Sequence, residues 1–329
     1  VRQIEVPWAE PGSSFTALFE SLVIDWLLEA SLSAVARRLR LTWDQVDGIM
    51  ERAVRRGLAR RGRQLPSRIG IDETSFQKHH EFVTVVTDLD RGKVVEVIDT
   101  RRKEALERYY ETLDEEQLGC IQVVAMDMGQ AYINATRTYV PDAESKIAFD
   151  KFHVAQMLTV AVNEVRIAEN RRLVREGDDQ LKGTRWLWVQ NPDRMSEARW
   201  TGRFEALRES TLKTARAWGI KELAMTLWDY VRRGPAEKAW KKWLAWALRC
   251  RLKPMRKVAK SIRSHLWGIL NAIMHRVTNA KAEAINSRIQ WLKKRACGYR
   301  NRKRFRNAIY IHQGGLDLHP RPRAAHTIS

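Results

Sequence analysis

Two acidic residues stand out because each follows or interrupts a short apolar run. Asp72 lies beside Ile69 and Ile71, and Asp127 directly follows the apolar residues 123–126. Runs of this kind predict β-strands, and strand ends open onto the crevice where α/β proteins place their sites. Taken singly, each acid also has an ordinary structural interpretation: Asp127 could cap a following helix, and Asp72 could be a strand-end charge.

The sequence around Glu283 favours the functional interpretation of these acids over the structural one. Between residues 251 and 306 the chain has seventeen Lys and Arg residues and a single acid, Glu283. A surface that only contacts phosphates has no evident need for this acid. A helix predicted here places Asn279, Glu283 and Asn286 on one face. The alternative is a local salt bridge, worth a few tenths of a kcal/mol when exposed.

Three carboxylates in a basic protein predict a metal site, provided that the strands carrying Asp72 and Asp127 are neighbours. Two Mg²⁺ or Mn²⁺ ions per active site, about 4 Å apart, can activate a water or a 3′-hydroxyl and stabilise the oxygen leaving phosphorus. Mg²⁺ takes oxygen ligands, so Asp and Glu are suitable residue types. Asp72, Asp127 and Glu283 are therefore the candidate catalytic and metal-binding residues.

The charge balance indicates a polyanionic partner. The net charge is +20 and the isoelectric point is about 10.2, which favours nucleic acid as the usual neighbour. No apolar run reaches the ~20 residues of a membrane span. No signal peptide is recognised, and the three cysteines lack metal-ribbon spacing. We expect a cytoplasmic, nucleoid-associated protein that does not bind membranes.

The elements that must position these residues begin with a helical N-terminal domain. After an N-terminal arm at 1–14, helices are predicted at 15–28, at 33–39 and from Trp43 onwards. A short helix, a tight turn and a second helix make a helix-turn-helix. Residues 15–66 are therefore predicted to be a helix-turn-helix DNA-binding domain with a basic linker. The alternative is a helical hairpin that only packs on its neighbour.

The helix from Trp43 is expected to lie in a major groove, and the basic segment near residue 293 to hold the DNA backbone. The predicted DNA-binding residues are Trp43, Gln45, Arg52, Arg55, Arg56, Lys293, Lys294, Arg295 and Arg300. Asp47 is a further possible reader.

After the linker the apolar period becomes strand-like. Strands are predicted at 68–76, 82–88, 93–99, 120–126 and 146–149, and helices at 102–113, 129–139 and 151–172. The first three strands read as an antiparallel meander, so residues 67–172 form the first part of an α/β core with a mixed sheet.

The segment 173–275 has no strand pattern and contains nine of the thirteen tryptophans. It is predicted to be an all-helical insertion whose tryptophans, Trp240 and Trp243 among them, form the core; stacking on DNA is the alternative. Residues 276–312 return to the catalytic core with a helix at 277–294 and a basic segment, and 313–329 form an irregular tail.

The combination of motifs resembles the DDE transposases of the ISL3 insertion-sequence family. The resembling segments, in order along the chain, are GIDETSF at 70–76, AMDMGQAY at 125–132, FDKFHV at 149–154 and NAKAEAINS at 279–287, continuing through GYR at 298–300. The resemblance implies a ribonuclease H-like mixed sheet interrupted by the helical insertion and preceded by the helix-turn-helix. It also implies that Asp72, Asp127 and Glu283 are the catalytic triad.

The reaction implied by the resemblance is cleavage of DNA at the ends of an element, followed by joining of the 3′-hydroxyls to target DNA. Its partners would be double-stranded terminal inverted repeats and target DNA, with a homodimer in the synaptic complex. Asp150 and His153 match an Asp-x-x-His element of such transposases, and Asn279 is a further accessory candidate. The structural alternative for Asp150 is a helix cap. Members commonly carry a cysteine-rich zinc-binding segment before the helix-turn-helix, and residues 1–14 contain no cysteine.

Three other functions were weighed. A ribonuclease H-like nuclease or resolvase would use the same acids to cut without joining. A DNA-binding regulator derived from a transposase would have no need of all three carboxylates. A basic structural protein of the nucleoid would predict no link between the strands and Glu283.

Overall fold

The computed structural model describes residue 6 and residues 8–62, 65–77, 81–99, 103–190, 203–277 and 280–321. The chain forms two compact units. The first comprises Val1–Val124, Asn134–Pro141 and Ala280–Ser329, and the second comprises Ala125–Ile133 and Asp142–Asn279. In the part of the chain described, no helix is both long enough and apolar enough to cross a membrane.

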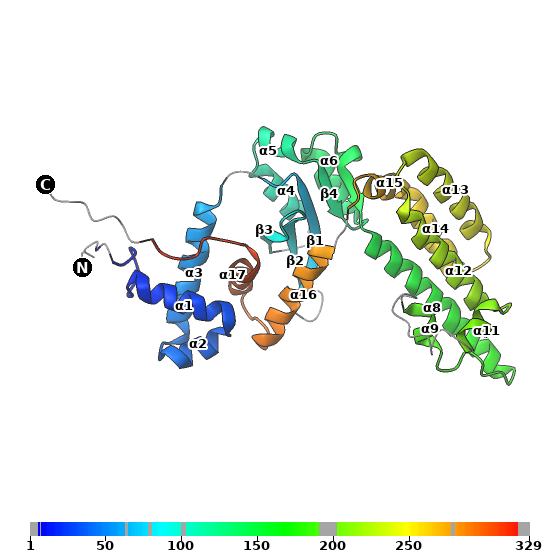
Figure 1. Ribbon diagram of the computed structural model, residues 1–329, viewed down its shortest axis with the longest axis horizontal. Coiled ribbons are helices and arrows are strands. Elements are labelled where there is room, and N and C mark those ends of the chain that lie inside the picture. The colour runs from blue at the N-terminus through cyan, green and yellow to red at the C-terminus, as the bar shows by residue number, and fades with distance from the viewer. Residues whose placement is uncertain are drawn as a thin grey trace. The chain divides into compact units, whose positions relative to one another are not determined.

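The N-terminal domain consists of α1 (Ala17–Glu29), α2 (Leu32–Leu39) and α3 (Trp43–Arg60) (Figure 1). Arg40 ends α2 in the left-handed conformation, with φ of 55°, which turns the chain into α3. The Thr42 hydroxyl accepts from the Gln45 amide at 3.2 Å, and the Gln45 side chain accepts from the Thr42 amide at 2.8 Å. This capping box starts α3 at Trp43, as predicted.

The sheet has the strand order β3-β2-β1-β4-β5. Its strands are β1 (Arg68–Gln77), β2 (Glu81–Asp88), β3 (Lys93–Ile98), β4 (Val123–Met126) and β5 (Ile147–Phe149). The predicted antiparallel meander of the first three strands is confirmed. The adjacency of β1 and β4, on which the predicted metal site depends, is confirmed as well.

The last two strands run parallel to β1. The amides of Gln122 and Val123 donate to the Ser67 carbonyl at 2.7 and 3.1 Å, so β4 begins where β1 begins. The Asp150 amide donates to the Met126 carbonyl at 3.1 Å, which joins the ends of β5 and β4. The sheet is therefore mixed, and its parallel strands end at one edge.

Several predicted boundaries were wrong. The strand predicted at 120–126 includes Cys120, but Cys120 ends the helix α5 (Glu115–Cys120). This helix forms because Asp114 and Gln117 make a capping box at its start. The helix predicted from 277 does not include Val277, and its described part is α16 (Ala280–Arg295). The helices α4 (Lys103–Glu111), α6 (Gln130–Tyr139) and α7 (Ala143–Lys146) complete the connections between strands.

One hydrophobic core runs through the first unit. It joins residues of all three N-terminal helices to one face of the meander through α16 and α17 (Arg302–Gln313). Ile49 of α3, Val83 of β2, Ile289 of α16 and Phe305 of α17 are each no more than 1% exposed. The helix-turn-helix therefore shares its core with the sheet.

The second unit is largely helical. Its helices are α8 (Lys151–Arg175), α9 (Arg185–Val189), α11 (Arg203–Glu209), α12 (Lys213–Thr226), α13 (Arg233–Arg249), α14 (Lys253–Ser264) and α15 (Leu266–Met274) (Figure 1). Trp188, Trp240 and Trp243 are buried in it, whereas Trp186 and Trp246 are exposed. The core interpretation thus holds for three of these tryptophans. α8 continues through the predicted boundary at 172.

Candidate active site

Asp72 lies in the middle of β1, and both of its carboxylate oxygens accept hydrogen bonds. Oδ1 accepts from the Glu73 amide at 2.7 Å, and Oδ2 accepts from the Asn286 side-chain amide of α16 at 2.6 Å. The carboxyl group is half-buried. Two donors on different elements hold the Asp72 side chain in one orientation, as is typical of a metal ligand supported by neighbouring groups.

α16 runs beside β1 along a ladder of side-chain contacts. Beyond the Asn286–Asp72 bond, Gln290 donates to the Thr74 hydroxyl at 2.7 Å, and the Lys293 ammonium donates to the Ser75 carbonyl at 3.0 Å. A methyl group on Gly70 would lie 3.8 Å from Ala282. Successive turns of α16 therefore follow successive residues of β1 in the same direction.

Glu283 lies in the first turn of α16 and is exposed. It precedes Asn286 by three residues, so the two side chains share a helix face. Asn286 bonds to Asp72, so Glu283 lies about one helical turn before the residue of α16 that contacts Asp72. Asp72 and Glu283 both belong to the first unit. Asn279 lies outside the described residues.

Asp127 belongs to the second unit and directly follows β4. Its Oδ1 accepts from the Gly129 amide at 2.8 Å, one residue before α6 begins at Gln130. A methyl group on Gly129 would lie only 2.7 Å from that oxygen. Glycine at 129 therefore leaves room for the carboxylate in its present orientation.

Asp150 and His153 lie beside the same strand end. Asp150 is 6% exposed and caps α8, with Oδ1 accepting from the Phe152 amide at 2.9 Å. Its Oδ2 is 3.2 Å from Nδ1 of the half-buried His153. Since the Asp150 amide bonds to Met126, the residues that follow β4 and β5 lie at one edge of the sheet. The capping role is thus observed, together with a carboxylate–imidazole pair.

Each predicted ligand is a carboxylate, and carboxylates suit Mg²⁺ and Mn²⁺. Asp72 and Glu283 are in the first unit and Asp127 is in the second. Within the described ranges, no group of three or more His, Cys, Asp or Glu side chains is gathered closely enough to hold a metal ion.

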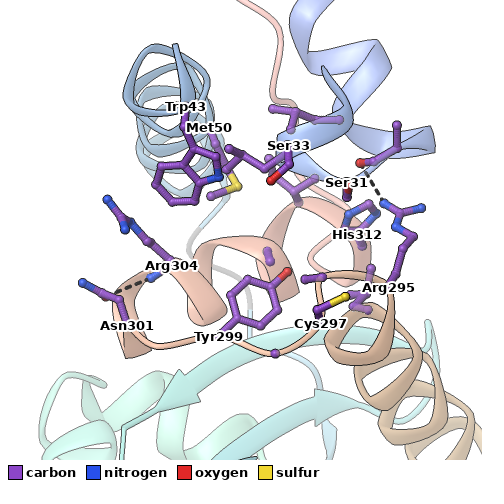
Figure 2. A pocket seen from close by; sticks show the side chains of 18 of the residues that line it. Ser31, Ser33, Trp43, Met50, Arg295, Cys297, Tyr299, Asn301, Arg304 and His312 are labelled. Carbon is purple, nitrogen blue, oxygen red and sulfur yellow. Dashed lines mark hydrogen bonds between the residues drawn. The ribbon is translucent and has the colours of Figure 1, made fainter. Parts of the chain in front are cut away.

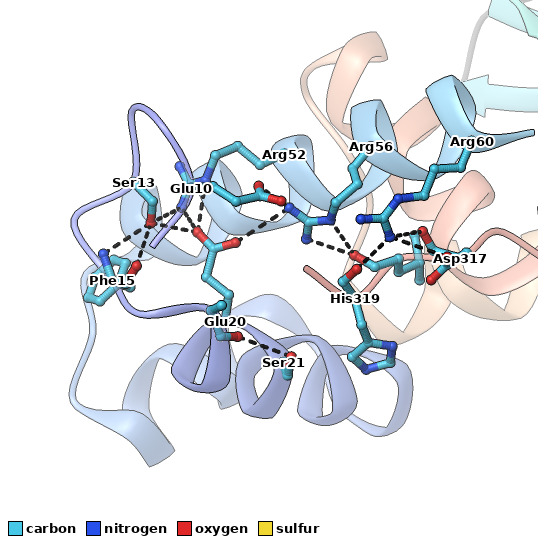
Figure 3. Close-up of polar contacts among 12 residues, drawn as sticks. Glu10, Ser13, Phe15, Glu20, Ser21, Arg52, Arg56, Arg60, Asp317 and His319 are labelled. Atoms are coloured by element: carbon cyan, nitrogen blue, oxygen red, sulfur yellow. Dashed lines mark hydrogen bonds and ion pairs between the residues drawn. The ribbon is translucent and has the colours of Figure 1, made fainter. Parts of the chain in front are cut away.

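Two of the arginines predicted to bind DNA point into the protein (Figure 3). Arg52 pairs with Glu20, whose side chain is 1% exposed, through Nε at 2.9 Å. Arg56 pairs with Glu10 and donates to the Leu318 carbonyl at 2.9 and 2.7 Å. Burial lowers the pKa of Arg56. Both guanidinium groups are therefore occupied by partners inside the protein.

The start of α3 is also engaged. The Trp43 ring lies under the Arg304 guanidinium at 4.1 Å, and Arg304 pairs with Asp47 at 2.9 Å. Burial raises the pKa of Asp47. The Gln45 side chain is exposed but is held by the capping box. The ion pair between Asp47 and Arg304 thus joins α3 to α17.

Exposed arginines occur elsewhere on the helix-turn-helix. Arg55 is exposed on α3, as a DNA contact requires. Arg37, Arg38 and Arg40 are exposed on α2 and at the turn after it, and they are not among the residues predicted to bind DNA. Their exposure could have been predicted from the sequence, because charged residues at the end of a short amphipathic helix lie on its solvent face.

The basic C-terminal residues have different surroundings. Lys294 and Arg300 are exposed. Lys293 is half-buried against Ser75, and burial lowers its pKa. Arg295 donates to the Glu29 and Ala30 carbonyls at the end of α1, at 3.0 Å each, and its guanidinium lies over the Trp291 ring. Lys293 and Arg295 thus also hold the protein together.

Comparison with known proteins gives consistent matches along the chain. Residues 69–309 match the family model described as transposase, of the DDE type in family ISL3, and residues 4–54 match the model of the helix-turn-helix domain of transposase family ISL3. The chain is similar to the transposase for insertion sequence element IS1557 of Mycobacterium tuberculosis, with 28% identity over 91% of this chain and 72% of the relative. It is also similar to the transposase for insertion sequence element IS1001 of Bordetella parapertussis, with 27% identity over 85% of this chain and 69% of the relative.

Proposed function

Since this chain belongs to the ISL3 family of DDE transposases, we propose that Asp72, Asp127 and Glu283 are the carboxylates that carry out its DNA chemistry. The chain is a polynucleotidyl transferase by family, and the family generally uses divalent metal ions. The three acids are the groups that would hold two Mg²⁺ or Mn²⁺ ions in this chain.

The hydrogen bond between Asn286 and Asp72 carries this proposal most directly. It joins a strand residue to the helix that bears Glu283, over a separation of 214 residues. A pair of isolated surface acids would have no need of this support. The strand order, with an antiparallel meander followed by two parallel strands, also supports a ribonuclease H-like core.

The reaction is a transfer at phosphorus. Water first attacks a phosphodiester at the element's end, the P–O bond to the 3′ oxygen breaks, and that oxygen leaves with a proton. The resulting 3′-hydroxyl then attacks a phosphodiester of the target DNA, the P–O bond to the target's 3′ oxygen breaks, and that oxygen leaves with a proton. Bound metal ions would supply charge neutralisation at the attacking and leaving oxygens. Asn286 keeps Asp72 oriented, and Gly129 leaves space for Asp127.

DNA binding follows from the helix-turn-helix and from the family. We propose that the helix-turn-helix binds the terminal inverted repeats, with the exposed Arg37, Arg38, Arg40 and Arg55 contacting phosphates. Two ends must meet before joining, so we propose a homodimer in the synaptic complex. We also propose that Asp150 and His153 act beside Asp127 by positioning DNA or water.

The test is cleavage and joining of DNA that carries the element's ends, with Mg²⁺ or Mn²⁺. Asp72→Ala, Asp127→Ala and Glu283→Ala should each bind DNA as the parent does and should fail to cut. Glu116→Ala removes an exposed acid of α5 and should cut normally. Joined products distinguish a transposase from a nuclease. Cutting by Glu283→Ala would remove that residue from the triad.

A further inference from the structure

A pocket of about 700 Å³ lies between the helix-turn-helix and the two C-terminal helices (Figure 2). Its walls come from the end of α1 and start of α2, from α3, and from the end of α16, the following loop and α17. All of these elements belong to the first unit. Its volume is in the range of small-ligand pockets, and its lining includes the apolar Leu27, Leu292 and Ile311.

The pocket has a cationic rim. Arg295, Arg300 and Arg304 line it, and none of its described lining residues is Asp or Glu. Arg304 pairs with Asp47 and Asp44, which do not line the pocket. Arg295 donates to backbone carbonyls, so no carboxylate in the described part of the chain neutralises its charge. Arg300 is exposed and has no ion pair among the described residues. An anionic group is therefore favoured at this rim.

Ring and amide groups line the interior. Figure 2 shows Tyr299 and Asn301 just before α17, His312 on α17, and Trp43 at the start of α3. Burial lowers the pKa of His312 to about 4, so its imidazole is neutral at pH 7 and offers one donor and one acceptor nitrogen. Neither the His312 ring nor the Tyr299 hydroxyl has a hydrogen-bond partner in the part of the chain described.

Rings, neutral hydrogen-bonding groups and arginines on an apolar floor match the parts of a nucleotide. A base needs a ring to stack on and a donor or acceptor along its edge, and the phosphate needs a cation. A base within a duplex cannot enter a concave pocket, because it is stacked and paired. An acidic peptide would use the arginines and leave the ring and imidazole nitrogens without a role.

We propose that this pocket holds one unpaired nucleotide of a DNA strand, with its base against Tyr299 and His312 and its phosphate at Arg300. This proposal rests on the proposed cleavage and joining of DNA ends. It adds a contact with an unpaired base, separate from the catalytic carboxylates. In this interpretation the protein holds a strand end or a displaced base between its DNA-recognition domain and α17. The contact needs no metal ion.

Fluorescence anisotropy in EDTA tests the proposal independently of cleavage. The probes are a labelled oligothymidylate of about twelve nucleotides and a duplex of about twenty base pairs, and the protein is the full chain. Tyr299→Ala and His312→Ala should each weaken oligothymidylate binding roughly fivefold or more, with duplex binding changed less than about twofold. Trp186→Ala removes an exposed ring of the second unit and should change neither affinity.

Arg300→Gln should weaken oligothymidylate binding and reduce the slope of log affinity against log salt by about 0.7. Arg108→Gln, an exposed arginine of α4, is the charge-matched control. Equal losses for single strand and duplex in the Tyr299 and His312 variants would overturn the unpaired-base assignment. Unchanged binding in both variants would overturn the pocket altogether.

A measurement on the parent chain covers the case in which a variant fails to fold. Oligothymidylate carrying 4-thiothymidine is irradiated on the protein, and the adduct is located by peptide mapping. Adducts at Tyr299, His312 or Trp43 support the proposal, and adducts confined to residues outside the pocket overturn it. Asp72→Ala should crosslink as the parent does. The crosslinking result therefore tests the pocket independently of the proposed catalytic triad.

Discussion

At the scale of single residues, the carboxylate of Asp72 is held by donors on two elements. Its two oxygens accept from the Glu73 amide and the Asn286 side chain. A carboxylate fixed in this way does not need to give up rotational freedom when it takes up a metal ion, which favours binding. Asn286 is therefore a positioning residue for Asp72.

Asn286→Ala should raise the Mn²⁺ concentration needed for half-maximal cleavage by about 10- to 100-fold, since it removes a hydrogen bond to a charged group. The readout is a titration of cleavage with Mn²⁺. Ser287→Ala alters the next, exposed residue of α16 and should leave the titration unchanged. A normal metal requirement for Asn286→Ala would show that Asp72 needs no such support.

Gly129→Ala should lower the cleavage rate by about tenfold or more, because the new methyl group would displace Oδ1 of Asp127. Stability should change little, because the displaced atom is the end of a side chain. Cleavage rate and thermal melting are measured together. Gly119→Ala meets no atom within 4 Å and serves as the control. An active Gly129→Ala protein would argue against a required orientation of Asp127.

At the scale of elements, α3 has a buried side and an exposed side that differ in function. Arg52 and Arg56 lie against Glu20 and Glu10, and Arg56 also holds the Leu318 carbonyl. Arg55 lies between them in sequence but faces solvent. Of these three arginines of one helix, only Arg55 is free of such internal burial, so the proposed DNA contact falls to Arg55.

Arg56→Ala should lower the free energy of unfolding by about 3 kcal/mol, since it leaves buried acceptors without their cation. Arg55→Ala should leave stability nearly unchanged and reduce the salt slope of DNA binding by about 1. Chemical denaturation and salt-dependent binding measure the two effects. The reverse pattern, a stable Arg56→Ala protein with weakened DNA binding, would contradict this division.

At the scale of the whole molecule, the C-terminal segment after α17 is part of the DNA-recognition domain. Leu318 is 4% exposed within the core of the first unit, and its carbonyl accepts from Arg56. The Arg60 guanidinium donates to the His319 carbonyl at 2.6 Å and pairs with Asp317 at 3.3 Å. Residues more than 250 positions apart are thus held together (Figure 3).

A chain ending at Gln313 should melt at least about 5 °C lower than the parent, because it loses the buried Leu318 side chain and the acceptors of Arg56 and Arg60. A chain ending at Arg321 keeps these contacts and should melt as the parent does. Differential scanning calorimetry measures both. Equal melting of the two truncated chains would exclude a structural role for residues 314–321.

The sequence alone determined the features that depend on neighbouring residues. The alternation of apolar residues predicted the meander, the helical period from Trp43 predicted the start of α3, and its isolation in a basic segment made Glu283 a candidate ligand. It missed α5, where the cap formed by Asp114 outweighs the apolar pattern, and it placed Val277 in a helix that does not include this residue. Local patterns predict elements because caps and side-chain periods act over one or two turns.

Only the tertiary structure decided which side chains meet. A pattern of charges could not show that Arg52 and Arg56 turn inward while Arg55 turns outward, because all three are arginines on one helix. It also could not pair Asn286 with Asp72 or bring Tyr299 beside the helix-turn-helix. These contacts join residues more than 200 positions apart, and they exist only because α16 and α17 pack between the N-terminal helices and the sheet.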